Sequence, residues 1–377
     1  MSWETIQLGK FLTLKRGYDL PSAVRKEGDI PIVSSSGITG HHNTRKVEGP
    51  GVVTGRYGTL GKVFFISEDF WPLNTALYVK DFKGNDPRFA AYFLRNFLKG
   101  TNSDKAAVPG VNRNDLHARE ICVTRDTHVQ RSIAFILSAY DDLIENNRRR
   151  IQLLEQAARL LYKEWFVHLR FPGHEHIKMI DGVPEGWVKG TVVDFGKCIT
   201  GKTPSTKISE NFGGNILFVK TPDMHRSRII IETEESLSDR GAATQHKKTL
   251  PVGTILVACI GAKLGVVSIT CRPCQTNQQI NAVIPYKDYM RYYILFALID
   301  IKPRLEAMGG GATMPNVNKT KFTSIPVLIP SENLLKEFEV VVMTLFQQIE
   351  LLEQQKSSLT KARDLLLPRL MNGEITV

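Results

Sequence analysis

The stretch "VPGVNRNDL", Val108–Leu116, returns as "MPNVNKTKF", Met314–Phe322, at an offset of 206 residues. Both contain Pro-x-Val-Asn followed by a cation. A proline followed by Gly or Asn suits the centre of a type II turn, because the second of these residues must accept a positive φ. A specific turn that occurs twice predicts that the chain holds two copies of one structural unit.

Polar groups follow each of these turns. Asn112 and Asn318 can hydrogen-bond to nearby backbone, and Arg113 or Lys319 comes next. The strand-like runs "EICV" and "IPVLIP" follow, and each leads into a long helical pattern. We therefore expect a hinge that joins a domain to a helix, with Arg113 and Lys319 as candidate phosphate contacts.

The duplication extends outward from the turns. Trp3 matches Trp187 at an offset of 184, and Gly61 matches Gly265 at an offset of 204. The increase predicts an insert of about twenty residues in the second copy, between Val219 and Gly265. Short β-branched or aromatic runs bounded by Gly, Pro and Asn read as strands, so each copy is predicted to be a mixed α/β domain.

Two heptad patterns follow the two copies. A narrow apolar stripe with a seven-residue repeat favours a partner helix over a broad globular face. Thr127 and Gln130 have the spacing of a capping box at the start of the first helix. The candidate pairing residues are Leu137, Tyr140, Ile144, Ile151, Leu154 and Leu161 in the first helix, and Leu345, Ile349, Leu352, Leu359 and Leu366 in the second.

The predicted fold class is α+β, with two similar α/β domains separated by a long antiparallel two-helix coiled coil. About forty helical residues would form a rod of roughly 60 Å, longer than one turn of DNA. The expected domains are residues 1–125, a helical spacer 126–171, a second α/β domain 172–330 and a second helical segment 331–377.

Positive charge is concentrated in the two α/β domains. Lysines and arginines exceed acidic residues by 6 in residues 1–125 and by 6 in 171–330, whereas the helical segments carry +1 and −2. An excess of cations on a compact domain attracts nucleic acid by releasing its counterions. No apolar run is long enough to cross a bilayer and the first residues do not resemble a secretory signal, so we expect a cytoplasmic protein without a membrane partner.

"GKCITGKT", Gly196–Thr203, fits the P-loop pattern letter for letter. A P-loop must open a helix at once, but Pro204 follows and no helical period continues. A P-loop ATPase with a coiled-coil arm therefore stays as an alternative, and so does a coiled-coil scaffold that binds RNA or an acidic protein. No catalytic grouping and no metal site is predicted.

The remaining candidates are loops suited to DNA. A Gly-rich turn lets backbone approach phosphate closely, and polar groups at strand ends can read base edges. The candidate DNA-binding residues are Ser35, Ser36, Arg56, Tyr57, Lys62, Arg113, Lys220, Thr221, Lys263 and Lys319.

These features together resemble the specificity subunit of type I restriction–modification systems. The resemblance rests on the Trp-bearing domain start, the Gly-rich loop, "PxVN[RK]", a heptad helix that runs into "EWF", "GVPEGW" before the second domain, and "RDLLLPRLMNGEI" near the end. It covers Trp3–Ile375. The family's Gly-rich loop maps onto Gly55–Gly61 and Gly261–Gly265, and its Asn-bearing strand start maps onto Asn74 and Asn281.

The resemblance implies that each α/β domain is a target recognition domain for one half of a split double-stranded DNA sequence. It implies that the helices set the gap and dock two methylase subunits, which a nuclease/translocase subunit joins. S-adenosylmethionine, ATP and Mg²⁺ would then belong to those partners, and this chain would hold no cofactor and no catalytic residue. Cys259 and Ile260 depart from Gly55 and Arg56 of the first copy, so the copies should read different half-sites.

Overall fold

The structure is a computed structural model that describes residues 3–56, 61–99, 112–261, 264–310 and 315–377. The chain folds into two compact units. Unit 1 consists of Met1–Glu145 together with Ser358–Val377, and unit 2 consists of Asn146–Ser357. Within the described ranges, no helix combines the length and apolar character that a membrane crossing requires.

The described residues of unit 1 form three small sheets. The order is β1–β9 in the first, β2–β8–β5–β6 in the second and β4–β3–β7 in the third, where β3 and β7 are parallel. The strands are β1 (Trp3–Gln7), β2 (Thr13–Arg16), β3 (Ile30–Ser34), β4 (Gly37–His42), β5 (Gly51–Gly55), β6 (Val63–Ile66), β7 (Trp71–Pro72), β8 (Ala76–Asp81) and β9 (Glu120–Thr124).

Helices α1 (Leu8–Phe11), α2 (Pro87–Phe97) and α3 (Arg113–Ala118) complete the first copy. Proline at the first position and the Asp86 side chain, which accepts a hydrogen bond from the Phe89 N–H at 2.8 Å, fix the start of α2. The α2 residues Phe89 and Leu94 are fully buried in the main core of unit 1.

Unit 2 repeats this arrangement. The sheets are β12–β21, β13–β20–β17–β18–β15 and β16–β14–β19, where β14 and β19 are parallel. The strands are β12 (Val188–Thr191), β13 (Gly196–Thr200), β14 (Phe212–Val219), β15 (Ile229–Ile230), β16 (Ser236–Leu237), β17 (Ile255–Ala258), β18 (Val267–Thr270), β19 (Cys274–Thr276), β20 (Ile280–Pro285) and β21 (Pro326–Ile329). A short hairpin, β10 (Met179–Ile180) with β11 (Val183–Pro184), precedes them.

Besides parts of the two long helices, the described residues of unit 2 form α5 (Val192–Phe195), α6 (Thr221–Met224), α7 (Asp239–Ala243), α8 (Arg291–Asp300), α9 (Lys302–Gly309) and α10 (Lys319–Thr323). The predicted insert forms α6, β15 and α7 between β14 and β17. Strand β15 extends the five-stranded sheet by pairing in parallel with β18. Among the described residues of the first copy, no strand of the four-stranded sheet corresponds to β15.

Equivalent hydrogen bonds confirm the duplication and fix its register. The Gly17 N–H donates to the Ala76 carbonyl at 3.1 Å, and the Gly201 N–H donates to the Ile280 carbonyl at the same distance. Ala76 therefore corresponds to Ile280. In this register Asn281 corresponds to Leu77, so the predicted match between Asn74 and Asn281 is wrong: a similar pattern of letters lies three residues out of structural register.

Glycine is required at the first of these positions in both copies. A Cβ on Gly17 would lie 2.2 Å from the Leu73 carbonyl oxygen, and one on Gly201 would lie 2.1 Å from the Asn277 carbonyl oxygen. The backbone at Leu73 and Asn277 cannot move away without losing hydrogen bonds, because it is hydrogen-bonded on both sides. The two glycines thus mark the same close approach between strands.

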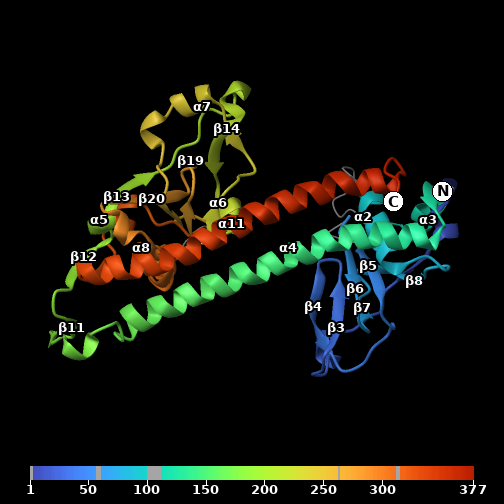
Figure 1. The fold of residues 1–377 in the computed structure, drawn as a ribbon, viewed down its shortest axis with the longest axis horizontal. Coiled ribbons are helices and arrows are strands. Elements are labelled where there is room, and N and C mark those ends of the chain that lie inside the picture. The colour runs from blue at the N-terminus through green and yellow to red at the C-terminus, as the bar shows by residue number, and fades with distance from the viewer. Residues whose placement is uncertain (1–2, 57–60, 100–111, 262–263, 311–314) are drawn as a thin grey trace. The chain divides into compact units, whose positions relative to one another are not determined.

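The two heptad patterns form α4 (Thr127–Tyr162) and α11 (Glu332–Met371), which lie side by side (Figure 1). In unit 2 the amide of Asn147 lies 3.3 Å from Gln355, and the ring of Tyr162 lies 6.4 Å from that of Phe338. A later residue of α4 thus meets an earlier residue of α11, so the helices are antiparallel as predicted.

The predicted capping box at the start of α4 is wrong. Asp126 caps the helix, because its carboxylate accepts the N–H groups of His128 at 2.9 Å and Val129 at 3.4 Å. Gln130 is fully buried, and its amide donates to the Asn85 side chain and to the Thr124 carbonyl. This glutamine joins the long helix to the α/β part of unit 1.

Candidate nucleic-acid interface

The repeated turn is a helix cap in both copies. The Asn112 side chain accepts the Asn114 N–H at 3.0 Å and starts α3, while the Asn318 side chain accepts the Lys321 N–H at 2.9 Å and starts α10. Short polar side chains favour this position because they satisfy helix N–H groups that have no carbonyl partner. The predicted role of both asparagines is confirmed, although the short helices were not anticipated.

The cations that follow these caps are accessible. Arg113 and Lys319 are the first residues of α3 and α10, and both are exposed. Val108–Val111 and Met314 lie outside the described residues, so the first predicted type II turn does too. In the second copy, the φ of Asn316 is not positive, as a type II turn would require. The predicted type II turn is therefore wrong there.

The Gly-rich loops differ between the copies. Arg56 is half-buried and Lys62 is exposed, whereas Tyr57 and Lys263 lie outside the described residues. Cys259, which takes the place of Arg56, is buried, and this burial raises the pKa of its thiol to about 11. The second copy therefore begins this loop with an apolar side chain where the first has a guanidinium. The sequence indicated this difference but set Cys259 and Ile260 against Gly55 and Arg56, one residue away from the structural alignment.

Polar side chains gather where β3 and β14 end. In the first copy, the buried Ser34 hydroxyl lies 2.9 Å from that of Ser36, which is exposed beside the half-buried Ser35. In the second, Lys220 forms an ion pair with Glu235, and the Thr221 hydroxyl donates to the Gln279 side chain at 3.2 Å. These candidates occupy matching positions in the two copies.

Two neighbouring segments meet these strand ends. In the first copy the Tyr18 N–H donates to the Pro72 carbonyl, and the Leu73 N–H donates to the Val33 carbonyl. In the second, the Lys202 N–H donates to Thr276 and the Asn277 N–H donates to Val219. We call this place the strand-end edge. It comprises residues 15–19, 34–36, 46 and 71–74 in the first copy and residues 201–203, 220–221, 245 and 276–279 in the second.

The P-loop interpretation fails on backbone structure. Gly196–Thr200 is strand β13, paired with β20, and the next helical turn begins only at Ser209. Amides that belong to a sheet cannot surround a phosphate as those of a P-loop do. Within the part of the chain that the structure describes, no three His, Cys, Asp or Glu side chains are grouped as metal ligands.

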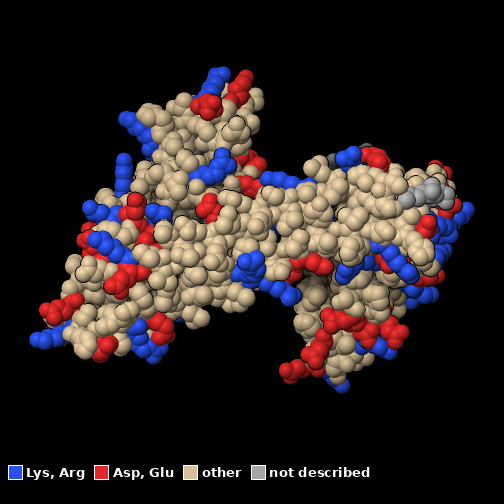
Figure 2. Space-filling view, viewed as in Figure 1, with Lys and Arg blue, Asp and Glu red and all other residues tan. Residues whose placement is uncertain are grey.

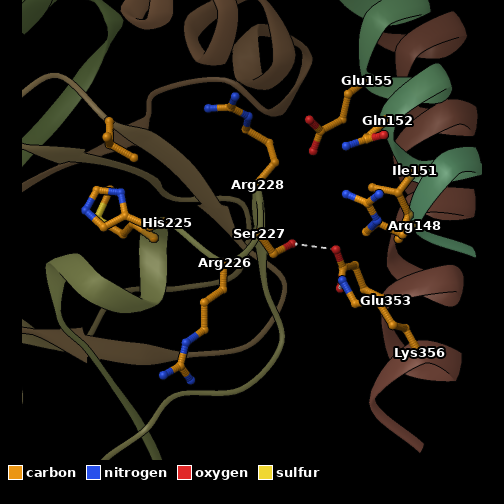
Figure 3. A pocket seen from close by; sticks show the side chains of 12 residues that line it. Arg148, Ile151, Gln152, Glu155, His225, Arg226, Ser227, Arg228, Glu353 and Lys356 are labelled. Carbon is orange, nitrogen blue, oxygen red and sulfur yellow. Dashed lines mark hydrogen bonds and ion pairs between the residues drawn. The ribbon is translucent and has the colours of Figure 1, made fainter. Parts of the chain in front are cut away.

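A cavity of about 410 Å³ lies inside unit 2, where the insert meets the long helices (Figure 3). The Ser227 hydroxyl donates to Glu353 at 3.0 Å, and Glu353 also pairs with Lys356 at 2.5 Å. Burial raises the pKa of Glu155 and lowers that of Arg228, whose guanidinium donates to the Val267 carbonyl at 2.6 Å. Charges of both signs line the cavity, so its electrostatic field does not favour a polyanion. The hydrogen bonds around it hold the insert against the long helices.

Charge is unevenly distributed over unit 1. Figure 2 shows Lys and Arg side chains gathered at the end of the unit where α3 and β8 lie, and acidic side chains over the end that carries β3 and β4. Exposed cations at the first of these ends include Lys80, Lys83, Arg113 and Arg119. On this face, unit 1 therefore has a basic end and an acidic end.

Most of the candidate pairing residues lie in apolar cores. Ile151, Leu154, Leu161, Leu345, Ile349 and Leu352 contribute to one core of unit 2, and Leu137 and Leu366 contribute to the main core of unit 1. Tyr140, Ile144 and Leu359 are half-buried outside these cores. Lys356 and Arg363, which interrupt the apolar register of α11, face acidic partners instead.

Comparison with known proteins points to one family. The model of the type I restriction modification DNA specificity domain matches residues 1–156 and 184–361. The HindI specificity subunit of Haemophilus influenzae is 32% identical over 314 residues, which cover 66% of this chain and 68% of that protein. The MjaIX specificity subunit of Methanocaldococcus jannaschii is 27% identical over 259 residues, covering 66% of this chain and 59% of the relative.

A solved structure shares the fold. The crystal structure of a type I restriction–modification S subunit from M. genitalium matches with a TM-score of 0.65 at 19% identity, covering 98% of this chain and 96% of that one.

Proposed function

This chain belongs to the type I restriction–modification specificity subunits, and on that premise we propose that it reads a split DNA target, one half-site for each copy. The observation that carries the proposal is the repeated architecture. Both copies combine a parallel strand pair, β3–β7 or β14–β19, with a sheet whose four corresponding strands pair antiparallel in the same order. One reading unit built twice suits two separate half-sites better than one continuous site.

The side chains of the two copies support different half-sites. The framework hydrogen bonds of Gly17 and Gly201 are the same, yet the residues that follow are Tyr18 in one copy and Lys202 in the other. A conserved backbone with different functional groups is what separate base sequences require, because donors and acceptors on base edges are read by matching side chains.

Exposed apolar side chains on the long helices support docking of two like partner subunits. Phe135 on α4 and Val340 on α11 are 75% and 63% exposed, and Leu160 and Leu365 are 62% and 70% exposed. Both pairs are related by the same offset, 205 residues, close to that of the repeated turn. Exposed apolar side chains that recur at one offset in the two copies fit two copies of one partner, because each can contact an equivalent place.

In this proposal the partners are two methylase subunits, and nuclease/translocase subunits join them. S-adenosylmethionine, ATP and Mg²⁺ would act on those subunits, while this chain contributes DNA binding and no catalytic group.

The test is a methylation assay of the chain assembled with its methylase subunits. The substrate is a duplex library with a randomised central region, and modified molecules are sequenced. We expect two short specified sequences separated by an unspecified gap of constant length. A single continuous site, or a pattern that methylase subunits alone reproduce, would contradict the proposal.

A further inference from the structure

The strand-end edge of the first copy combines aromatic rings with two lysines. The Lys46 ammonium lies 5.6 Å from the Tyr18 ring centre and 5.2 Å from that of Trp71, and Lys15 lies 5.1 Å from the Tyr18 ring. The Tyr18 and Tyr78 hydroxyls are 3.0 Å apart, and Lys15 donates to Tyr18 at 3.2 Å. These contacts hold two cations over ring faces at one place.

At this edge, Lys15 and Lys46 differ from the neighbouring arginines because no described carboxylate forms an ion pair with either ammonium group. Arg45 is paired with Asp69 and Glu48, and Arg16 lies 3.9 Å from Asp19. Among the described residues, no carboxylate lies within 4.0 Å of the ammonium of Lys15 or Lys46. The edge therefore keeps positive charge for an external anion, although acidic residues stand nearby.

The second copy builds the same edge from amides and hydroxyls. Lys202 occupies the place of Tyr18, with the same backbone hydrogen bond to the parallel strand. The Thr203 hydroxyl donates to Gln278 at 2.7 Å, and the Asn277 amide donates to Gln279 at 3.1 Å. Gln278 is exposed, and its unused N–H groups match the acceptors on base edges.

Unsatisfied polar atoms mark this edge in both copies. Within the described part of the chain, the buried side-chain nitrogen and oxygen atoms without a hydrogen-bond partner are Trp71 Nε1, Gln245 Oε1 and Thr276 Oγ1. Trp71 contacts Lys46, and Gln245 donates through its other amide atom to the Lys202 carbonyl. Folded proteins rarely leave such atoms unpaired, so each of the three is a polar group whose partner is missing within the described chain.

We propose that the strand-end edge is the DNA-reading surface of each copy. Lys15 and Lys46 contact phosphates and Tyr18 contacts a base in the first half-site, while Lys202 contacts phosphate and Gln278 reads a base in the second. This inference rests on the proposed function and adds to it the residues that determine specificity. It also predicts that the two copies read their half-sites with different side chains. The reading surface is aromatic and cationic in the first copy and rich in amides in the second.

The experiment uses the full chain assembled with its methylase subunits and follows DNA binding and methylation of the split target. Lys46→Met keeps the apolar stem over the two rings and removes the charge. We expect it to weaken binding about tenfold at every sequence and to reduce the slope of log K against log salt by about 1. The matched control is Lys80→Met, an exposed lysine near the other end of β8, which should leave the slope unchanged.

Two further variants test base reading. Tyr18→Phe keeps the ring and removes the hydroxyl, and it should relax base preference in one half-site only. Gln278→Ala should relax the other half-site only. Unfolding curves establish that each variant is folded, and Lys15→Met replaces Lys46→Met if the latter is unstable.

The inference is overturned if Lys46→Met and Lys80→Met behave alike, or if Tyr18→Phe and Gln278→Ala leave both half-sites unchanged. The proposed function survives that result, provided that the unmodified chain still selects a split target. If the unmodified chain selects no split target, the proposed function itself fails.

Discussion

The guanidinium of Arg363 on α11 lies 2.6 Å from the carboxylate of Asp141 on α4. The other carboxylate oxygen accepts the Tyr92 hydroxyl at 2.6 Å and faces Arg95 at 3.4 Å. Burial opposes the charge on Asp141, but hydrogen bonds from Tyr92 and Arg363 outweigh it and lower the pKa of this carboxyl group. This explains why a cation occupies a position of the heptad register: it meets an anion on the facing helix.

Asp141→Asn should destabilise unit 1 by about 1–3 kcal/mol, because Arg363 and Arg95 lose their shared anion in a half-buried place. The free energy of unfolding in urea measures the loss. Asp142→Asn, a neighbouring exposed carboxylate, is the matched control and should change stability little. Because the folded pKa is lowered, the contribution of Asp141 is present above the unfolded pKa and disappears as pH falls through the folded value, in the acid range below pH 4.

Glu339 gives stability the opposite pH dependence. It is 8% exposed, and burial raises the pKa of its carboxyl group to about 7, although it accepts the Tyr292 N–H at 3.1 Å and lies 3.9 Å from Arg291. The folded protein therefore holds this proton more tightly than the unfolded chain. Unfolding free energy should fall as pH rises from about 4.5 to about 7 and stay level above that, as far as this group is concerned.

Glu339→Gln should remove this dependence, because the amide keeps the acceptor for Tyr292 and carries no charge to bury. At pH 8 the variant should be more stable than the unmodified chain by about 1–3 kcal/mol. Thermal unfolding from pH 5 to pH 8 checks the prediction, with the exposed Glu337→Gln as control. A pH profile identical to that of the unmodified chain would show that Glu339 does not titrate in this range.

Gly373 should not tolerate alanine. Its φ is +73°, and a Cβ would lie 2.4 Å from the indole nitrogen of Trp3. We expect Gly373→Ala to cost about 1–3 kcal/mol in unfolding free energy, from both backbone strain and the clash. Gly84→Ala is the control, because its φ is +81° and the space around its Cβ is open. Equal losses in the two variants would mean that the contact with Trp3 contributes nothing.

Removal of one heptad from both long helices tests their role in spacing, and this prediction rests on the proposed function. The contact between Asn147 and Gln355 places Arg148–Leu154 opposite Gln348–Gln354. Deleting both segments removes about 10 Å of helix and should shorten the preferred gap by about three base pairs, with both half-sites unchanged. Sequencing of methylated library DNA measures the gap. An unchanged gap would remove the helices from the account of spacing.

Sequence patterns that repeat were reliable guides to this fold. Repeating patterns of residues and glycines such as Gly17 and Gly201 are visible in the sequence. They were enough to predict the duplication, the strand runs, the insert and the antiparallel helices. Asn112 and Asn318 were also identifiable, because helix caps are local and use few residue types.

Features that depend on distant contacts could not be predicted. Gln130 resembled a capping residue, but its role is set by Asn85, which lies 45 positions away. Tyr18, Lys46 and Trp71 meet because the Tyr18 N–H donates to the Pro72 carbonyl and the Lys46 N–H donates to the Phe70 carbonyl, on either side of Trp71. No spacing rule links these three residues. The predicted match between Asn74 and Asn281 was wrong for a related reason. Identical residue types near the start of a strand do not fix the register of strand pairing.

The order of synthesis sets the order in which these units can be completed. Unit 2 is one continuous segment of the chain, whereas unit 1 needs Ser358–Val377, and Leu367 and Leu370 fill its core beside Leu137. On the ribosome, domains generally fold in the order in which they emerge. Here the unit that emerges first must wait for residues made after all of unit 2, so the second copy can finish folding while the first still lacks part of its core.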